Sequence, residues 1–250
     1  MRYEKTVGTG ARESSMIEAF VTNLGKYNND VLCGEYLKLP ATTEDVQGLL
    51  SRIGVDGVVY EEFFITDYKT DISGLSDCLG EYESIDELNY LAALLDEMDE
   101  DELTKFKAAV ECGDDTGSVK DLINLAQNLD CYDYFPGVDS NEDLGYYLID
   151  NYGMLAIPAD VQPYFDYEAY GRDYALNESG DFTGGGYIVR GYGRSTEYYD
   201  GRRDDIPEEY RIFAYPDPQK MNMREQMEMY GNMVMAGRSA DRHVRAHEEI

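Results

Sequence analysis

Residues 60–103 contain 15 acidic side chains against a single base, Lys69, yet they keep enough apolar residues to fold. Carboxylates repel one another, and this repulsion weakens any compact state that brings them together. A stretch that keeps so many of them must place them on its surface. We therefore expect residues 60–103 to fold with exposed acids that meet a positively charged partner.

The acidity is spread over most of the chain but spares its ends. The 250 residues are 43% apolar and 12% aromatic, as in a folded protein rather than a disordered acidic tail. Residues 17–189 carry 37 acidic and eight basic side chains, a net charge of −29, whereas residues 190–250 carry only −2. Nucleic acid is excluded as a simple ligand, because phosphate binding needs a basic face. Cations or a basic protein surface fit better.

Cysteine usage and hydropathy point to a cellular compartment. Cys33, Cys78, Cys112 and Cys131 lie in separate segments without a Cys-x-x-Cys pair, which favours reduced thiols. The N-terminus has no apolar core of a signal peptide, and no apolar run reaches membrane-spanning length. We expect a cytoplasmic protein that does not bind membranes.

The pattern of the first third predicts a flexible arm, residues 1–16, followed by a small α+β domain, residues 17–83. Strands are expected at 17–22, 35–39 and 60–68, and the polar run between the first two is expected to be a loop. A helix capped by Thr42 or Thr43 should end at Gly54.

Residues 84–129 predict an acidic helical domain. Ser84 and Glu87 have the Ser-x-x-Glu spacing of a capping box ahead of a helix over 84–98. A second helix is expected over 100–112 with Gly113 as its terminator, and a third after Ser118. Their apolar residues recur at helical spacing, so the remaining faces should be acidic.

Residues 130–190 predict a second α+β domain. The run CYDYF reads as a strand, helices are expected over 141–152 and 161–170, and Gly171 is expected to stop the second of these. Residues 181–190 should form a turn and a last strand. The fold class is thus α+β, with three small domains.

Residues 191–250 form an extension with a different composition, rich in Gly, Arg, Pro and Met. We expect weak order up to Pro218 and a Met-rich helix at about 219–236. Most of the chain's 23 tyrosines are expected to pack as amphipathic core and rim residues, and some to lie at an interface.

Patterns that would indicate a metal, phosphate or catalytic site are absent or incomplete. An EF-hand loop starting at Asp96 would put Asp101 at the glycine position and Lys107 at the glutamate position, so it fails. His243 and His247 lack a third ligand, and Gly184–Gly186 lacks the helix of a phosphate-binding loop. We predict no catalytic, metal or cofactor-binding residues, and therefore no enzyme.

Several separated motifs resemble one family in the right order. They are the run Asn23–Asn28 followed by Gly34, Glu61-Glu62 with Asp67-Tyr68, Glu81-Tyr82 with Ile85, Leu88 and Asn89, and Tyr164 with the stretch from Asp166 to Asp173. Over about residues 17–189 the chain resembles the ArdA antirestriction proteins of conjugative plasmids and transposons. The N-terminal arm and the extension after Val189 have no counterpart in this resemblance.

The resemblance implies an elongated chain of three domains that forms a symmetric homodimer. In this family, surface carboxylates imitate the phosphates of bent B-form DNA. The family occupies the DNA-binding groove formed by the specificity and modification subunits of type I restriction-modification enzymes, and it is not enzymatic.

The acids expected to imitate phosphates are those of residues 60–103 and the pair that follows. They are Glu61, Glu62, Asp67, Asp71, Asp77, Glu81, Glu83, Asp86, Glu87, Asp96, Glu97, Asp99, Glu100, Asp101, Glu102, Asp114 and Asp115. The alternative from another class is an acidic cation-binding or salt-adapted protein without a specific protein partner. Stabilisation by Ca²⁺ beyond that of NaCl at equal ionic strength would favour this alternative.

Overall fold

The computed structural model describes residues 15–113, 115–217, 223–224, 227 and 230–231. Helices and two small antiparallel sheets confirm the predicted α+β class. The chain divides into two compact units, Met1–Thr70 with Ile212–Ile250, and Asp71–Arg211. The predicted helical and second α+β domains both lie in the second unit, and the boundary between them stays a prediction. Most of the predicted arm and Met-rich helix, and both histidines, lie outside the described residues.

The first unit contains a three-stranded antiparallel sheet. The central strand is β1 (Ile17–Asn23), flanked by β2 (Gly34–Leu39) and β3 (Phe63–Lys69). The third strand starts later than predicted, because the Asp56 carboxylate accepts hydrogen bonds from the backbone amides of residues 58–60 and holds them in a turn.

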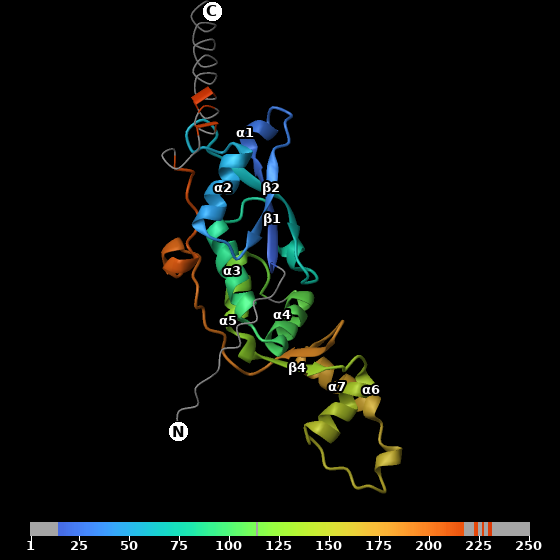
Figure 1. Ribbon diagram of the computed structural model, residues 1–250. Coiled ribbons are helices and arrows are strands. Elements are labelled where there is room, and N and C mark those ends of the chain that lie inside the picture. The colour runs from blue at the N-terminus through green and yellow to red at the C-terminus, as the bar shows by residue number, and fades with distance from the viewer. Residues whose placement is uncertain (1–14, 114, 218–222, 225–226, 228–229, 232–250) are drawn as a thin grey trace, which may run out of the picture. The chain divides into compact units, whose positions relative to one another are not determined.

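One helix packs on this sheet, and local sequence signals set both of its ends (Figure 1). Thr42 and Asp45 form a reciprocal capping box at the start of α2 (Thr43–Ile53). Gly54 ends the helix at a φ of 78°, a left-handed conformation that disfavours side chains. The buried face of α2 consists of Val46, Leu49, Leu50 and Ile53. Before it, the expected loop after β1 contains one helical turn, α1 (Leu24–Tyr27), capped by Asn23.

The second unit begins with three helices in the predicted order. They are α3 (Ile85–Glu97), α4 (Glu100–Cys112) and α5 (Val119–Gln127). The side chains of Ser84, Asp99 and Ser118 cap their N-termini. Helices α3 and α5 pack on each other, whereas α4 packs on the strands that follow. The buried residues of the three helices include Leu88, Leu91, Leu95, Phe106, Val110, Leu122 and Ile123.

A second antiparallel sheet follows, in the order β4 (Tyr132–Pro136), β6 (Gly186–Arg190) and β5 (Asp181–Thr183). Between β4 and β5 lie α6 (Asn141–Tyr146), which continues as a wider π turn over Tyr147–Asn151, and α7 (Tyr167–Glu178). Short 3-10 turns occur at Leu75–Cys78, Leu129–Cys131, Gln162–Tyr164, Arg203–Asp205 and Glu208–Tyr210. Tyr187 is fully buried against Phe135 in this core, and Tyr147, Tyr170 and Tyr174 pack around it, as expected for amphipathic tyrosines.

The predicted helix over 161–170 is wrong, because Gly171 does not stop a helix. Asp166 caps α7, and the helix runs through Gly171 to Glu178. Gly171 is buried where α7 crosses α6, and a Cβ there would overlap the carbonyl oxygen of Asn141. Gly145 of α6 is equally close to the backbone of α7. Both glycines therefore serve close helix packing rather than helix termination.

Residues 191–217, for which composition predicts weak order, instead pack on both units. The part from 195 to 211, hereafter the strap, lies on α3 and α5, and it buries Tyr199 and Ile206. The part from 212 to 217 lies on the first unit, where Phe213 contacts Phe63 and the Tyr215 hydroxyl donates to the carbonyl of Glu61. Composition misses this order because the contacts are made to side chains distant in sequence.

Candidate partner-binding surface

The densest group of predicted site residues lies where α3 ends and α4 begins, at residues 96–102, hereafter the helix corner. Asp96 and Glu97 end α3, Asp99 caps α4, and the remaining acids, Glu100 to Glu102, occupy the first turn of α4. All six carboxylates are exposed. They sit on ordered backbone, because Asp99 accepts from the Glu102 amide at 2.8 Å and Glu102 accepts from the Asp99 amide at 3.1 Å.

Helix dipoles favour only part of this arrangement. Acids in the first turn of α4 face the positive end of its dipole, which stabilises them. Asp96 and Glu97 face the negative end of α3, which disfavours acids by about 0.3–1 kcal/mol each. In α3, α4, α5 and α7, all described in full, the last turn contains no base. The negative charge is thus kept where helix stability alone would favour cations.

Seven other predicted site residues are also exposed. In the second unit they are Asp71, Asp77, Glu81 and Asp115, and in the first unit Glu61, Glu62 and Asp67. Asp67 accepts a hydrogen bond from the Tyr36 hydroxyl, and Asp115 pairs with Arg190 at 3.0 Å. Asp114 lies outside the described residues.

Three predicted site residues do not lie on the open surface. Asp86 is 2% exposed and forms an ion pair with Arg203 of the strap. Glu87 is half-buried and accepts a hydrogen bond from the Tyr199 hydroxyl at 2.7 Å. Its amide is capped by Ser84, but its carboxylate turns to Tyr199 rather than completing the predicted capping box. Glu83 is half-buried and accepts from the Gly80 amide.

Four of the eight bases of residues 17–189 make contacts with carbonyls, a ring or a carboxylate of the same fold. Lys26 donates to the carbonyl of Ile53 at 3.0 Å, and Lys105 donates to the carbonyl of Tyr132 at 2.7 Å. Lys69 lies over the Tyr36 ring at 3.8 Å, and Arg52 pairs with Glu35, whose pKa is lowered by this hydrogen bond. Lys26 and Lys105 are thereby half-buried, whereas Lys69 and Arg52 stay exposed beside their partners.

A further set of exposed acids was not predicted as part of the site. They lie on and around α6 and α7, and they are Asp139, Glu142, Asp143, Asp150, Asp160, Asp166, Glu168 and Asp173. The sequence does contain a signal for them, because residues 130–189 hold 12 acids and a single base, Arg172. The excess of acids over bases in this stretch is almost as large as in residues 60–103, and we include its exposed acids in the candidate surface.

The described residues hold no group of three or more Cys, His, Asp or Glu side chains placed to bind a metal ion. Within the same part of the chain, no helix has the length and apolarity needed to cross a membrane. The arrangement that remains is a display of ordered, exposed carboxylates with few cations between them.

Comparison with known proteins agrees with this picture. The family model described as "Antirestriction protein (ArdA)" matches residues 19–189, which is more than half of the chain. No curated protein sequence matches the chain. The matched part contains the helix corner, both sheets and the acids around α6 and α7, while the strap lies outside it. The chain therefore belongs to the ArdA family of antirestriction proteins.

Proposed function

We propose that the exposed carboxylates imitate the phosphates of B-form DNA and block the DNA-binding groove of a type I restriction-modification enzyme. Family membership supports an antirestriction role. The charge has the right scale, because duplex DNA carries about one charge per 1.7 Å of axis. A net charge of −29 over residues 17–189 thus corresponds to roughly 50 Å of duplex.

The helix corner is the observation that carries this proposal. The reciprocal capping box fixes the carboxylates of Asp99 and Glu102, and the two helix ends order the backbone that carries the other four, which limits the conformational freedom lost on binding. Phosphates of DNA are likewise held on an ordered backbone. A groove that binds DNA mainly through phosphate contacts already carries lysine and arginine side chains, and these would contact the carboxylates of the helix corner.

The proposal extends to partners and assembly. The specificity and modification subunits form the groove, the chain acts as a homodimer in the cytoplasm, and it catalyses no reaction. Two copies would double the length of duplex that the charge can imitate. The sites in this proposal are the exposed acids of both units rather than one pocket.

Competition with duplex DNA at different salt concentrations tests the proposal. Binding of a phosphate mimic releases counterions as DNA binding does, so the affinity of the protein for a type I enzyme, measured directly without DNA, should fall steeply between 50 and 200 mM NaCl. The inhibitor and a cognate duplex should also exclude each other from the enzyme. An affinity for the enzyme that is insensitive to salt, or a ternary complex with bound duplex, would contradict phosphate mimicry.

Thermal melts separate this proposal from the cation-binding alternative. Screening of self-repulsion should raise the melting temperature similarly in NaCl and CaCl₂ of equal ionic strength. A much larger shift in CaCl₂ would instead favour a protein that binds cations.

A further inference from the structure

The strap is held on α5 through its backbone. Asn128 accepts from the Thr196 amide and donates to the Thr196 carbonyl, each at 2.8 Å. Asn124, one helical turn earlier, accepts from the amides of Tyr198 and Tyr199 and donates to the Tyr199 carbonyl at 2.7 Å. A side-chain amide offers one acceptor and two donors, so it can pair with a peptide backbone as a neighbouring strand would.

Side chains of the strap provide anchors further along. Tyr199 is 1% exposed, and its hydroxyl donates to Glu87 of α3. Arg203 pairs with the buried Asp86, and Ile206 is fully buried. Tyr210 stacks on Tyr90 at a ring distance of 5.2 Å, and its carbonyl accepts from Asn89.

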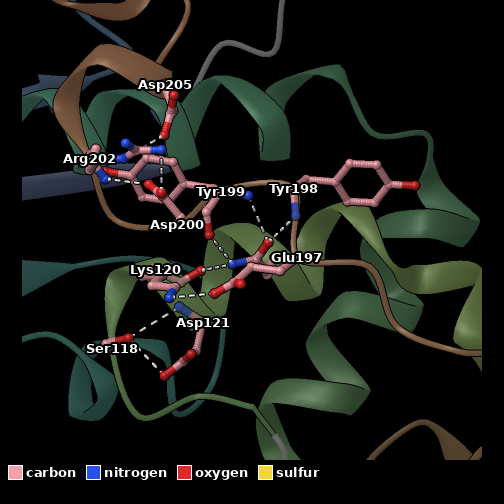
Figure 2. Close-up of polar contacts among 10 residues, drawn as sticks. Ser118, Lys120, Asp121, Glu197, Tyr198, Tyr199, Asp200, Arg202 and Asp205 are labelled. Atoms are coloured by element: carbon pink, nitrogen blue, oxygen red, sulfur yellow. Dashed lines mark hydrogen bonds and ion pairs between the residues drawn. The ribbon is translucent and has the colours of Figure 1, made fainter.

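Figure 2 shows the part of the strap around Tyr198 and Tyr199, where the backbone pairing takes place. Tyr198 is exposed, and its amide takes part in the backbone pairing by donating to Asn124. Lys120 of α5 pairs with Glu197 at 2.6 Å on the exposed side. The strap is therefore recognised by backbone pairing at residues 196–199 and by a few spaced side chains after it, which is how proteins bind linear peptides.

The strap and the face that holds it also differ in whether they match the ArdA family. The face, made by Asp86, Glu87, Asn89, Asn124 and Asn128, lies within the residues that match the ArdA family. The strap lies after the matched residues. Asparagine is a poor helix former, so Asn89 within α3 and Asn124 within α5 are explained by the strap that they hold, and Asn128, which caps the end of α5, adds to the same face.

We propose that the α3–α5 face is a peptide-binding site and that the strap is its displaceable intramolecular ligand. The ligand is a linear segment with a buried tyrosine, an arginine four residues later and an isoleucine three residues after that, as in Tyr199, Arg203 and Ile206. This inference does not depend on DNA mimicry. Because the strap is tethered, its effective concentration is on the order of millimolar, so a free peptide should compete poorly with it.

A labelled peptide of residues 195–211 tests the proposal in trans. The receptor is the full chain with Tyr199→Ala and Arg203→Ala, which weakens the tethered strap but leaves the face intact. Fluorescence anisotropy should show at least tenfold tighter peptide binding to this receptor than to the wild-type chain. Adding Asn124→Ala and Asn128→Ala to the receptor should reduce binding at least tenfold.

Matched peptides control for charge and for anchoring. A peptide with Asp204→Asn should bind like the parent, since the Asp204 side chain is 96% exposed. A peptide with Tyr199→Ala should bind at least tenfold more weakly. If the receptor keeps its helical circular dichroism and cooperative melt but does not bind the parent peptide, the strap is not an exchangeable ligand.

Hydrogen exchange on the wild-type chain gives an independent answer if the receptor fails to fold. The amides of Thr196, Tyr198 and Tyr199 should exchange by local opening, at least tenfold faster than core amides such as Leu91 and Leu122. Exchange of both groups at one rate, set by global unfolding, would show that the strap is an inseparable part of the unit and would overturn the proposal.

Discussion

At the scale of single residues, burial decides whether a carboxylate is available to bind a partner or instead stabilises the folded chain. Asp86 is 2% exposed and pairs with Arg203, whose side chain is 57% exposed. Removing one partner of a fully buried pair costs about 3–5 kcal/mol, but solvent around Arg203 screens this pair. We expect Asp86→Asn to lower the free energy of unfolding by about 1–2 kcal/mol in urea titrations. Asp96→Asn, at an exposed site, should change it by less than about 0.5 kcal/mol. Equal effects of both substitutions would contradict this assignment.

Buried tyrosines make stability depend on alkaline pH. Burial raises the pKa of Tyr187 to about 12, and burial with the hydrogen bond to Glu87 raises the pKa of Tyr199. A phenol with a raised pKa in the folded state contributes stability that is complete below the unfolded pKa, near 10, and is lost as pH rises through the folded pKa. The free energy of unfolding should therefore fall between about pH 10 and 12, by on the order of 2 kcal/mol for Tyr187.

Tyr187→Phe checks this linkage. The variant cannot ionise at that position, so urea unfolding measured from pH 8 upward should show a shallower decline above pH 10 than the wild type. Tyr164→Phe, with a ring that is 86% exposed, is the matched control and should keep the wild-type decline. An unchanged slope in Tyr187→Phe would argue against a role for this phenol.

At the scale of elements, the α6–α7 contact depends on glycine rather than on helix propensity. Alanine stabilises an exposed helix by about 0.5–1 kcal/mol relative to glycine. At Gly171, however, a Cβ would overlap the Asn141 carbonyl oxygen, so the two helices would have to move apart. We expect Gly171→Ala to lower the free energy of unfolding by about 2 kcal/mol or more, as overpacking does.

Gly48 provides the control within α2. A Cβ there would meet only the guanidinium end of Arg52, at 3.2 Å, and this flexible group can shift. Gly48→Ala should therefore raise the free energy of unfolding by about 0.5 kcal/mol or more. Thermal and urea unfolding of the two variants should move in opposite directions, and a stabilised Gly171→Ala would refute the packing argument.

The helix ends could be predicted from the sequence, whereas contacts between distant residues could not. Helices α2 and α4 follow from neighbouring residues, since Thr42 and Asp99 cap them and Gly54 and Gly113 end them. The role of Gly171 and the order of the strap depend on contacts across many residues, which local patterns do not contain.

For the candidate surface, the acid-rich stretches could be read from composition, but individual exposure could not. Glu81 and Asp86 belong to the same run of acids, yet only Glu81 faces solvent, because Arg203 and the strap cover Asp86. The importance of Asn124 and Asn128 was likewise missed. Their i, i+4 spacing on α5 was a signal, but it acquires meaning only beside an extended segment.

At the scale of the whole molecule, a net charge of −30 should act as a distributed field rather than as one site. Exposed ion pairs contribute roughly 0.2–1 kcal/mol each, in contrast to hot-spot residues, whose loss costs 2 kcal/mol or more. We expect Glu61→Gln or Glu100→Gln alone to leave inhibition of a type I enzyme within about fivefold of the wild type.

Neutralising the helix corner together should have a multiplicative effect. The variant replaces Glu97, Asp99, Glu100, Asp101 and Glu102 by the matching amides, which can still accept the capping hydrogen bonds. Five contributions of this size sum to about 1–5 kcal/mol and predict binding to the enzyme weaker by roughly 5- to 4,000-fold at low salt, with a shallower salt dependence of that binding. The melting temperature should stay close to that of the wild type, since relief of repulsion within the corner is opposed by the loss of favourable helix-dipole interactions at the start of α4. Five amides around α6 and α7, at Asp139, Glu142, Asp143, Asp150 and Asp160, test whether charge elsewhere on the surface acts in the same way. If one amide substitution abolished inhibition in a folded protein, while neither five-residue variant weakened it, a single specific site would replace the distributed mimic.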